Sequence, residues 1–350
     1  MNITFLIGNG FDVGIGMRSS FKNFFPIYQE QSQKKPKRIK QLSDTIGDNH
    51  ETWADFETEI GKYTINFNKD TKQDFLDQVK DFEEEFIAYL KKEEAALIIN
   101  EDVESVIVNA LLEYYLVPNL SPESYEAIKN VYDSCSAESH FYNFVNFNYT
   151  FTLEKCLEKV TQKIVRKRKY GGSDRVDKIG KVVHVHGHCN LFPIIGVNDV
   201  SQIANKELAD DDTFTRFLVK PSINKLLRQG NDVNATSIIN ESKIICVYGM
   251  SLGATDKKWW ELLVKWLAGS SNRQLIVFDY DEKYTPSTPF VWLEKEDSII
   301  SKLSDYSADS EIIPENLRSR IHIAVHKNIF AMNLSRNNID EWISLISKLR

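Results

Sequence analysis

The sequence predicts an α/β protein whose core is a doubly wound, mostly parallel sheet with a large helical insertion. Short apolar runs recur along the chain without polar alternation, as in strands that helices cover on both faces. Helical patterns separate most of these runs, which is the order of a doubly wound sheet. The segment between the first two runs is far longer than a simple crossover, so we expect it to pack as a subdomain.

The first predicted strand covers residues 3–7, where every side chain is apolar or β-branched, and it stops at Gly8. Later strands are predicted at 141–147, 181–186, 243–248, 274–278 and 320–326. Helical patterns are predicted between or after them, at 151–168, 213–229, 256–268 and 337–349.

The predicted insertion covers residues 15–140 and is mainly helical. Apolar residues recur at three and four positions in Trp53, Phe56, Ile60, Tyr63 and Phe67, again from Phe75 to Leu90, and in two further helices at 102–117 and 122–133. Residues 1–14 and 141–350 then form the predicted α/β domain. The apolar helices of residues 53–117 could pack internally or between subunits, which leaves a homo-oligomer open.

A glycine-rich turn follows the first strand, and Ser19 and Ser20 resemble the cap of a helix after it. This order places backbone N–H groups beside the carboxyl end of a strand, where they can bind phosphate. The spacing is not G-x-G-x-x-G, so a tight strand-to-helix connection is the alternative. The predicted nucleotide contacts in this turn are Gly8, Asn9, Gly10, Phe11 and Asp12.

Polar or small residues also follow the next three predicted strands. They are Asn148 to Thr150 after the second, His184 to His188 at the third, and Gly249 to Gly253 after the fourth. Carboxyl ends of parallel strands meet at one edge of a sheet, so we expect these residues to surround one crevice.

Composition indicates a soluble protein. No apolar run reaches the length of a membrane span and no signal peptide precedes the first strand, so we expect a cytoplasmic protein without a membrane partner. The four cysteines form no C-x-x-C pair. The net charge of −7 makes nucleic acid an unlikely partner, although basic clusters at 34–40 and 166–169 leave local contact open.

Six motifs give the chain a family resemblance. They are GNGFD at 8–12, W-x-x-x-E at Trp53 and Glu57, FNYTxTLE at 147–154, HVHG at 184–187, IIGVND at 194–199 and YGMSLGATD at 248–256. In this order they resemble the AbiH family of bacterial abortive-infection proteins. The resemblance implies an antiphage protein, with a phage-derived trigger as a further expected partner.

The AbiH family is in turn similar to the sirtuin-type NAD-binding fold. That resemblance implies a Rossmann-like, sirtuin-like core that binds NAD and cleaves its nicotinamide–ribose bond, with Asn148 and His186 as catalytic residues. Gly249, Ser251 and Asp256 are then nucleotide contacts. The zinc cysteines are absent, so we do not expect a peptide deacetylase. Thr150 stands in place of the sirtuin aspartate, which leaves open whether NAD is cleaved or only bound.

The chemistry of these side chains fits that expectation. The imidazole of His186 can accept a proton near neutral pH, and the amide of Asn148 can fix a ribose hydroxyl or a water molecule. Asp12 can anchor ribose or the nicotinamide amide, or cap the next segment. Glu57 lies one turn beyond Trp53 and is either a second carboxylate of the site or a solvated side chain.

Three alternatives remain. Gly249-Met-Ser-Leu-Gly253 matches a serine-hydrolase elbow, with Ser251 as nucleophile, Asp279 or Asp281 as acid and His326 as base. A non-catalytic sensor of NAD, ADP-ribose or a related nucleotide is the second. His184, His186 and His188 alternate and could gather a metal, but no acidic residues with ligand spacing accompany them, so no metal is predicted.

Overall fold

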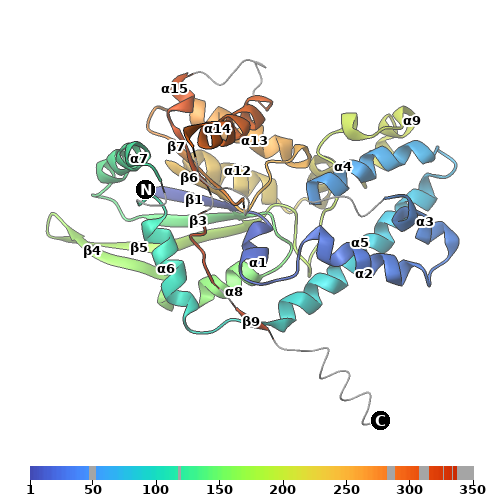
Figure 1. The fold of residues 1–350 in the computed structure, drawn as a ribbon, viewed down its shortest axis with the longest axis horizontal. Coiled ribbons are helices and arrows are strands. Elements are labelled where there is room, and N and C mark those ends of the chain that lie inside the picture. The colour runs from blue at the N-terminus through green and yellow to red at the C-terminus, as the bar shows by residue number, and fades with distance from the viewer. Residues whose placement is uncertain are drawn as a thin grey trace, which may run out of the picture.

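The computed structural model describes residues 1–46, 53–116, 120–281, 288–306, 315–325, 327–332 and 334–336 (Figure 1). Seven strands form one sheet in the order β4-β5-β3-β1-β6-β7-β8, and all neighbours are parallel except β4 and β5. The predicted α/β class with a mostly parallel sheet is confirmed. The strands are β1 Asn2–Ile7, β3 Phe141–Asn146, β4 Ile164–Tyr170, β5 Ser173–His184, β6 Ile244–Tyr248, β7 Gln274–Asp279 and β8 Ile321–Val325.

The first strand lies at the centre of this sheet. Strand β1 pairs with β3 on one side and β6 on the other, so that Phe5 lies between Phe144 and Cys246. The side chains of β1 from Ile3 to Ile7 are fully buried because helices cover both faces of the sheet. This explains why the sequence of β1 is apolar without alternation.

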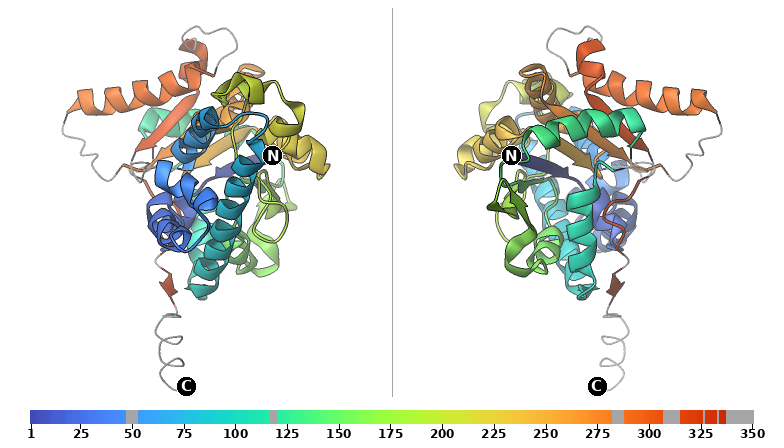
Figure 2. Two further views of the ribbon diagram at one scale, coloured as in Figure 1. Left: turned by 90° about the vertical axis from the view of Figure 1, so that its right-hand side faces the viewer. Right: turned by 90° about the vertical axis from the view of Figure 1, so that its left-hand side faces the viewer.

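Helices lie on each face of the sheet (Figures 1 and 2), and each face has its own apolar core. One core joins the sheet to α6 (Val103–Glu113), α7 (Pro122–Ser134) and α8 (Thr152–Glu158). The opposite core joins it to α12 (Asn231–Glu241), α13 (Lys257–Ala268) and α14 (Pro289–Ser304). The sequence patterns did not predict α12 or α14. The predicted helix at 337–349 lies outside the described residues.

A third core is formed by the helices beside the sheet. These helices are α2 (Phe21–Ser32), α3 (Lys37–Thr45), α4 (Trp53–Tyr63) and α5 (Lys72–Ala96), grouped at the right of Figure 1. Aromatic rings dominate their contacts; Phe56 stacks on Phe82 with ring centroids 4.3 Å apart. Part of this core comes from residues 189–219, far along the chain. The basic cluster at 34–40 contributes ion pairs to α5, from Lys35 to Asp81 and from Arg38 to Asp77.

The remaining described elements are short. Helix α1 covers Gly10–Gly14, and α9 (Lys206–Ala209), α10 (Asp212–Thr215) and α11 (Lys220–Leu227) lie within the predicted helical segment at 213–229 or just before it. Helix α15 covers Glu315–Arg318, and a two-stranded sheet pairs β2 (Leu97–Ile98) with β9 (Ser335–Arg336). No helix in the described ranges combines the length and the apolar composition of a membrane span.

The predicted helix at 151–168 is wrong in its second half. Only α8 is α-helical, and a short 3₁₀ turn follows at Thr161–Lys163. The chain then forms the antiparallel hairpin of β4 and β5, so the strand predicted at 181–186 begins already at Ser173. Gly171 and Gly172 adopt positive φ at the hairpin turn. A solvated loop or a helix end was the expected place of the basic residues 166–169, but in β4 they alternate between the two faces of a strand.

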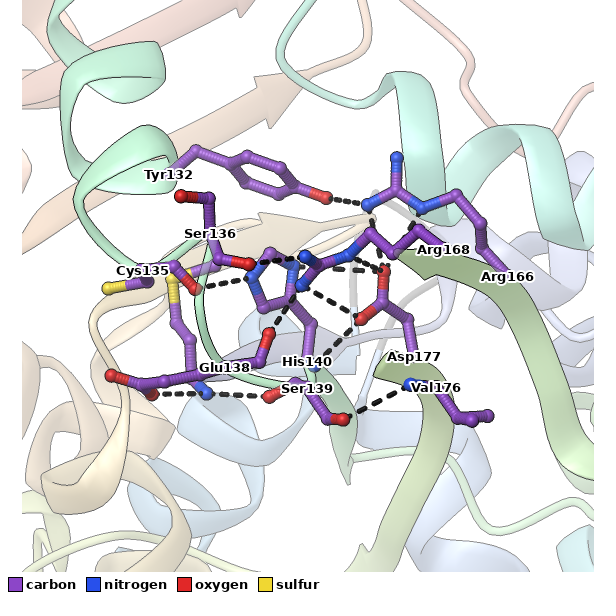
Figure 3. A network of polar contacts seen from close by, with 11 residues as sticks. Tyr132, Cys135, Ser136, Glu138, Ser139, His140, Arg166, Arg168, Val176 and Asp177 are labelled. Carbon is purple, nitrogen blue, oxygen red and sulfur yellow. Dashed lines mark hydrogen bonds and ion pairs between the residues drawn. The ribbon is translucent and has the colours of Figure 1, made fainter. Parts of the chain in front are cut away.

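Asp177 on β5 fixes this hairpin to its surroundings (Figure 3). Its buried carboxylate accepts hydrogen bonds from Arg166, Arg168 and the backbone N–H of His140. Burial opposes ionisation, but the bonds from Arg168, His140 and Arg166 outweigh it and lower the pKa of Asp177. Arg166 also donates to the Tyr132 hydroxyl at 2.6 Å, which connects the hairpin to α7.

Candidate functional site

A cavity of about 320 Å³ lies at the carboxyl ends of β1, β3 and β6. The chain passes from β1 to β3 and β5 on one side of the sheet, then returns to β6, β7 and β8 on the other. The cavity therefore lies where the strand order reverses. Its lining includes the predicted residues Gly8, Asn9, Gly10, Asp12, Glu57, Asn148, His186, Gly249, Ser251 and Asp256.

Phe11 is the predicted contact that does not line the cavity. Its side chain is fully buried and packs edge-on against Phe330, with ring centroids 5.4 Å apart. It belongs to the core between α1 and the sheet. The sequence could not distinguish this position from its neighbours because a short helix turns the Phe11 side chain inward.

The glycines of the first turn contact another loop of the protein. The N–H of Gly10 donates to the carbonyl of Gly249 at 2.9 Å. A Cβ atom on Gly10 would lie 2.5 Å from the Cα atom of Gly249, so no larger residue fits. The sequence interpretation assigned this N–H to phosphate. In the structure it holds the tips of β1 and β6 together.

Asn9 connects the first turn to the start of α2. Its side-chain oxygen accepts from the Ser19 hydroxyl at 2.6 Å, and its side-chain nitrogen donates to the Ser19 carbonyl at 3.2 Å. Ser20 caps α2, as predicted, by accepting from the backbone N–H of Asn23. Ser19, Ser20 and Phe21 line the cavity, so the N-terminus of α2 borders it.

Asp12 lies at the other side of the turn, and its carboxylate accepts from the hydroxyls of Thr150 and Thr152. Burial raises the pKa of Asp12 to about 6, against the effect of these two hydrogen bonds. Thr150 is the residue that departs from the sirtuin pattern. In this protein it is the hydrogen-bond partner of a buried carboxylate.

Asn148 is held at the end of β3. One hydrogen of its side-chain amide is donated to the Gly8 carbonyl at 3.1 Å, and its backbone N–H donates to the side chain of Asn146 at 3.0 Å. The residue is 5% exposed and lines the cavity. The amide oxygen and the second amide hydrogen remain chemically suited to a ligand.

His186, Asp256, Lys220 and Glu57 form a buried cluster in the cavity wall. The Nε2 atom of His186 lies 2.8 Å from Oδ1 of Asp256. The ammonium of Lys220 donates to the same Oδ1 at 3.3 Å and to Oε2 of Glu57 at 2.7 Å. Nδ1 of His186 is buried and has no hydrogen-bond partner among the described residues. The carboxylate partner favours a proton on Nε2, and in the neutral imidazole Nδ1 then carries the lone pair.

The carboxylates of this cluster have opposite pKa shifts. Burial raises the pKa of Glu57, and Lys220 only partly offsets it. Burial also disfavours the charged form of Asp256, but Lys220 and His186 outweigh it and lower the pKa of Asp256. Asp256 is therefore the ionised partner of His186. It was expected to contact nucleotide; in the structure it immediately precedes α13, and its side chain makes no cap hydrogen bond there.

His184 and His188 lie apart from this cluster. His184 contacts the Asn148 carbonyl through Nδ1 at 2.7 Å and Glu154 through Nε2 at 2.6 Å. The described His, Cys, Asp and Glu side chains include no group of three arranged to hold a metal ion. All four cysteines are buried and free.

The geometry of a serine-hydrolase elbow is not found at Ser251. An elbow requires its helix to begin at the nucleophile, whereas α13 begins at Lys257, and the strained positive φ belongs to Leu252. Asp279 lies 2.7 Å from the ammonium of Lys295, which also pairs with Asp281. His326 lies outside the described residues.

The chain was compared with models of known protein families, and one of them matches the part that carries the motifs. The family model described as Bacteriophage abortive infection AbiH matches residues 4–279. The chain belongs to the AbiH family. No protein with a curated description matches it. Membership associates this AbiH protein with abortive infection, the antiphage response that the family description names.

The AbiH motifs named from the sequence meet at the cavity. Glu57 comes from the W-x-x-x-E motif, His186 from HVHG and Asp256 from YGMSLGATD. The IIGVND motif supplies Gly196, whose N–H donates to Glu57 at 3.3 Å. Lys220 belongs to none of these motifs, and sequence reasoning missed it. Its partner Glu57 is 163 positions away, so only the fold brings them together.

Proposed function

We propose that this AbiH protein binds NAD in the cavity and cleaves its nicotinamide–ribose bond as part of an antiphage response. The observation that carries the proposal is the His186–Asp256 pair, buried in the wall of a cavity at the reversal of strand order. A histidine oriented by a carboxylate is suited to remove a proton from a substrate or water.

The order of the strands supports a Rossmann-like, sirtuin-like nucleotide-binding core. The six parallel strands, numbered by their order along the chain, lie in the order 3-2-1-4-5-6 across the sheet. This is the order of doubly wound dinucleotide-binding domains, where the ligand occupies the crevice at the reversal. A cavity of about 320 Å³ is at the small end of the range for ligand pockets.

The charges around the cavity favour a substrate that is or becomes positively charged. Three acids, Asp12, Glu57 and Asp256, line it, and Lys220 is the only lysine or arginine in that described lining. The nicotinamide ring of NAD carries a positive charge, and breaking its bond to ribose transfers positive charge to the sugar. Buried carboxylates stabilise such a charge, as they do in glycoside hydrolysis. Phe21, Phe86 and Phe147 provide apolar surface for a planar ring.

The proposed reaction is a hydrolysis. The bond between C1′ of the ribose and the ring nitrogen breaks, and its electron pair neutralises the nicotinamide ring. The oxygen of a water molecule bonds to C1′, and the proton of that water moves to Nδ1 of His186. Asn148 would hold the water or a ribose hydroxyl through its amide. The products are nicotinamide, ADP-ribose and one proton.

The test is nicotinamide release by the purified protein, measured by chromatography. We expect release by the wild type and a loss of about 10²- to 10⁴-fold in His186→Ala, the range for removing a general base. His188→Ala is the matched control, because His188 lies two residues away and does not line the cavity. Equal rates in wild type and His186→Ala would contradict the proposal. Binding of NAD or ADP-ribose without release would instead identify a nucleotide sensor.

A further inference from the structure

We propose that Lys220 is a positioning residue that keeps Asp256 oriented toward His186, so that the unprotonated Nδ1 of His186 serves the reaction. This inference rests on the proposed function and adds a residue that neither the motifs nor the sirtuin resemblance indicates. Lys220 touches no reacting atom in this proposal, because its contacts are with Asp256 and Glu57.

The first argument is the burial of Lys220. Its side chain is only 5% exposed, although it begins helix α11 next to Pro221. A lysine at the first position of a helix normally extends into water, and burial of its ammonium is strongly unfavourable unless partners compensate. The attraction of Asp256 and Glu57 outweighs burial and raises the pKa of Lys220, so the ammonium remains charged.

The second argument is the shared oxygen. Lys220 and His186 both approach Oδ1 of Asp256, at 3.3 and 2.8 Å. The ammonium therefore fixes the rotation of the carboxylate that receives the Nε2–H of His186. Without Lys220, only His186 among the described groups of the cluster could supply a positive charge, so a carboxylate would take up a proton, turn away or draw a proton onto the imidazole.

The third argument concerns what faces His186. The charged groups around it are Asp256 at the start of α13, Lys220 on α11 and Glu57 on α4. The titratable hydroxyl of Tyr149, which follows β3, interacts with Asp256 and Glu57. The Tyr149 hydroxyl is already donated to the Ile194 carbonyl at 2.8 Å. Lys220 is thus the cation that prevents the two acids from drawing a proton onto Nδ1. Removal of this cation should stabilise the imidazolium form and move the acidic limb of the pH profile to higher pH.

The test compares Lys220→Met and Lys220→Arg with Lys225→Met, a control on the exposed side of the same helix. The first readout is kcat/KM for nicotinamide release against pH. We expect the acidic limb of Lys220→Met to move up by about one pH unit or more, and that of Lys220→Arg and Lys225→Met to stay in place. A purely structural role would lower the rate or the melting temperature at every pH without moving the limb. An unmoved limb in Lys220→Met would overturn the proposal.

The second readout does not depend on activity. Nuclear magnetic resonance of ¹⁵N-histidine distinguishes the two imidazole tautomers. We expect His186 of the wild type to carry its proton on Nε2 near neutral pH and to lose this preference in Lys220→Met. A wild-type proton on Nδ1 would overturn the proposal even if no variant folds. If the wild type releases no nicotinamide, the proposed function fails, while the tautomer still decides the role of Lys220.

Lys220→Met leaves two buried acids without a cation and could unfold. In the double variant Lys220→Met with Glu57→Gln, one negative charge is removed together with the positive charge of Lys220. The net charge of the cluster therefore stays the same. Asp256 and His186 remain in it. We expect a smaller upward shift of the acidic limb in the double variant than in Lys220→Met, because Asp256 still faces His186 without a cation but Glu57 no longer adds its charge. A wild-type limb there would contradict the proposal.

Discussion

Asp12 shows how single residues at this site combine structural and electrostatic roles. It is 1% exposed, and the hydroxyls of Thr150 and Thr152 donate to its carboxylate. Three elements meet there, because Asp12 belongs to α1, Thr150 follows β3 and Thr152 begins α8. The sequence interpretation left Asp12 open as a ribose anchor or a cap. Its contacts make it the internal acceptor that fixes the loop after β3.

The pKa of Asp12 predicts a pH dependence of stability. Burial raises this pKa from 3.8 to about 6, so on acidification the folded protein binds the proton before the unfolded chain does. The free energy of unfolding contributed by Asp12 therefore increases as pH falls from ~6 to ~4, by up to ~3 kcal/mol at roughly 1.4 kcal/mol per unit.

Urea unfolding of wild type and Asp12→Asn at several pH values tests this prediction. The stability of the wild type relative to the variant should increase by up to ~3 kcal/mol from pH 7 to pH 4, because the variant has no proton to bind at this position. A constant difference across that range would show that Asp12 is ionised in the folded protein.

At the scale of elements, the tips of β1 and β6 meet without side chains between them. Gly10 donates to Gly249, and Gly249 has φ of +69°. A Cβ atom on Gly249 would lie 2.7 Å from the nitrogen of Phe11. The two loops that border the cavity therefore lie so close together that only glycine fits at both positions.

Gly249→Ala should be strongly destabilising. The positive φ alone costs ~1 kcal/mol for alanine, and the contact with Phe11 must also be relieved, so we expect a loss of at least ~2 kcal/mol. Gly172→Ala is the matched control: it has φ of +80° at the hairpin turn, but no atom lies within 4 Å of its Cβ position. Chemical unfolding of both variants measures the comparison. Equal losses would mean that the loops separate easily.

The elements that the sequence predicted well are those whose own residues carry a recognisable pattern. Strands β1, β3, β6 and β7 are buried apolar runs, and polar residues follow the first three at the cavity. The hairpin of β4 and β5 was missed because its basic residues hide the alternation of a strand. Lys220 was missed for the opposite reason: its local sequence is ordinary, and its burial depends on distant acids.

At the scale of the whole molecule, the cavity joins two cores that are otherwise separate. Phe86 and Leu90 of α5 reach it from the helical core, and Trp260 of α13 reaches it from one face of the sheet. The ion pair of Lys220 with Asp256, just before α13, connects the same two regions beside the cavity. A ligand in this position contacts both cores at once, so its binding should stabilise the molecule as a unit.

We expect ADP-ribose to raise the melting temperature. At a hundredfold excess over its Kd, a ligand that binds only the folded state adds about 2.7 kcal/mol. The comparison variant is Val13→Trp. Val13 lines the cavity but is 45% exposed, so a tryptophan ring there can cover the opening without entering a core. Differential scanning fluorimetry should show a smaller shift in this variant. No shift of the wild type at millimolar ADP-ribose would exclude the cavity as a site for this nucleotide.

The central place of β1 has a consequence for biosynthesis. The ribosome makes this strand long before its two neighbours, which are residues 141–146 and 244–248. At 5 to 20 residues per second, the second neighbour follows roughly 12 to 50 s later. During that interval the apolar strand β1 lacks at least one of its two neighbours in the nascent chain. Early recruitment of chaperones to the emerging β1 segment is therefore expected, and ribosome profiling of chaperone-bound nascent chains would detect it.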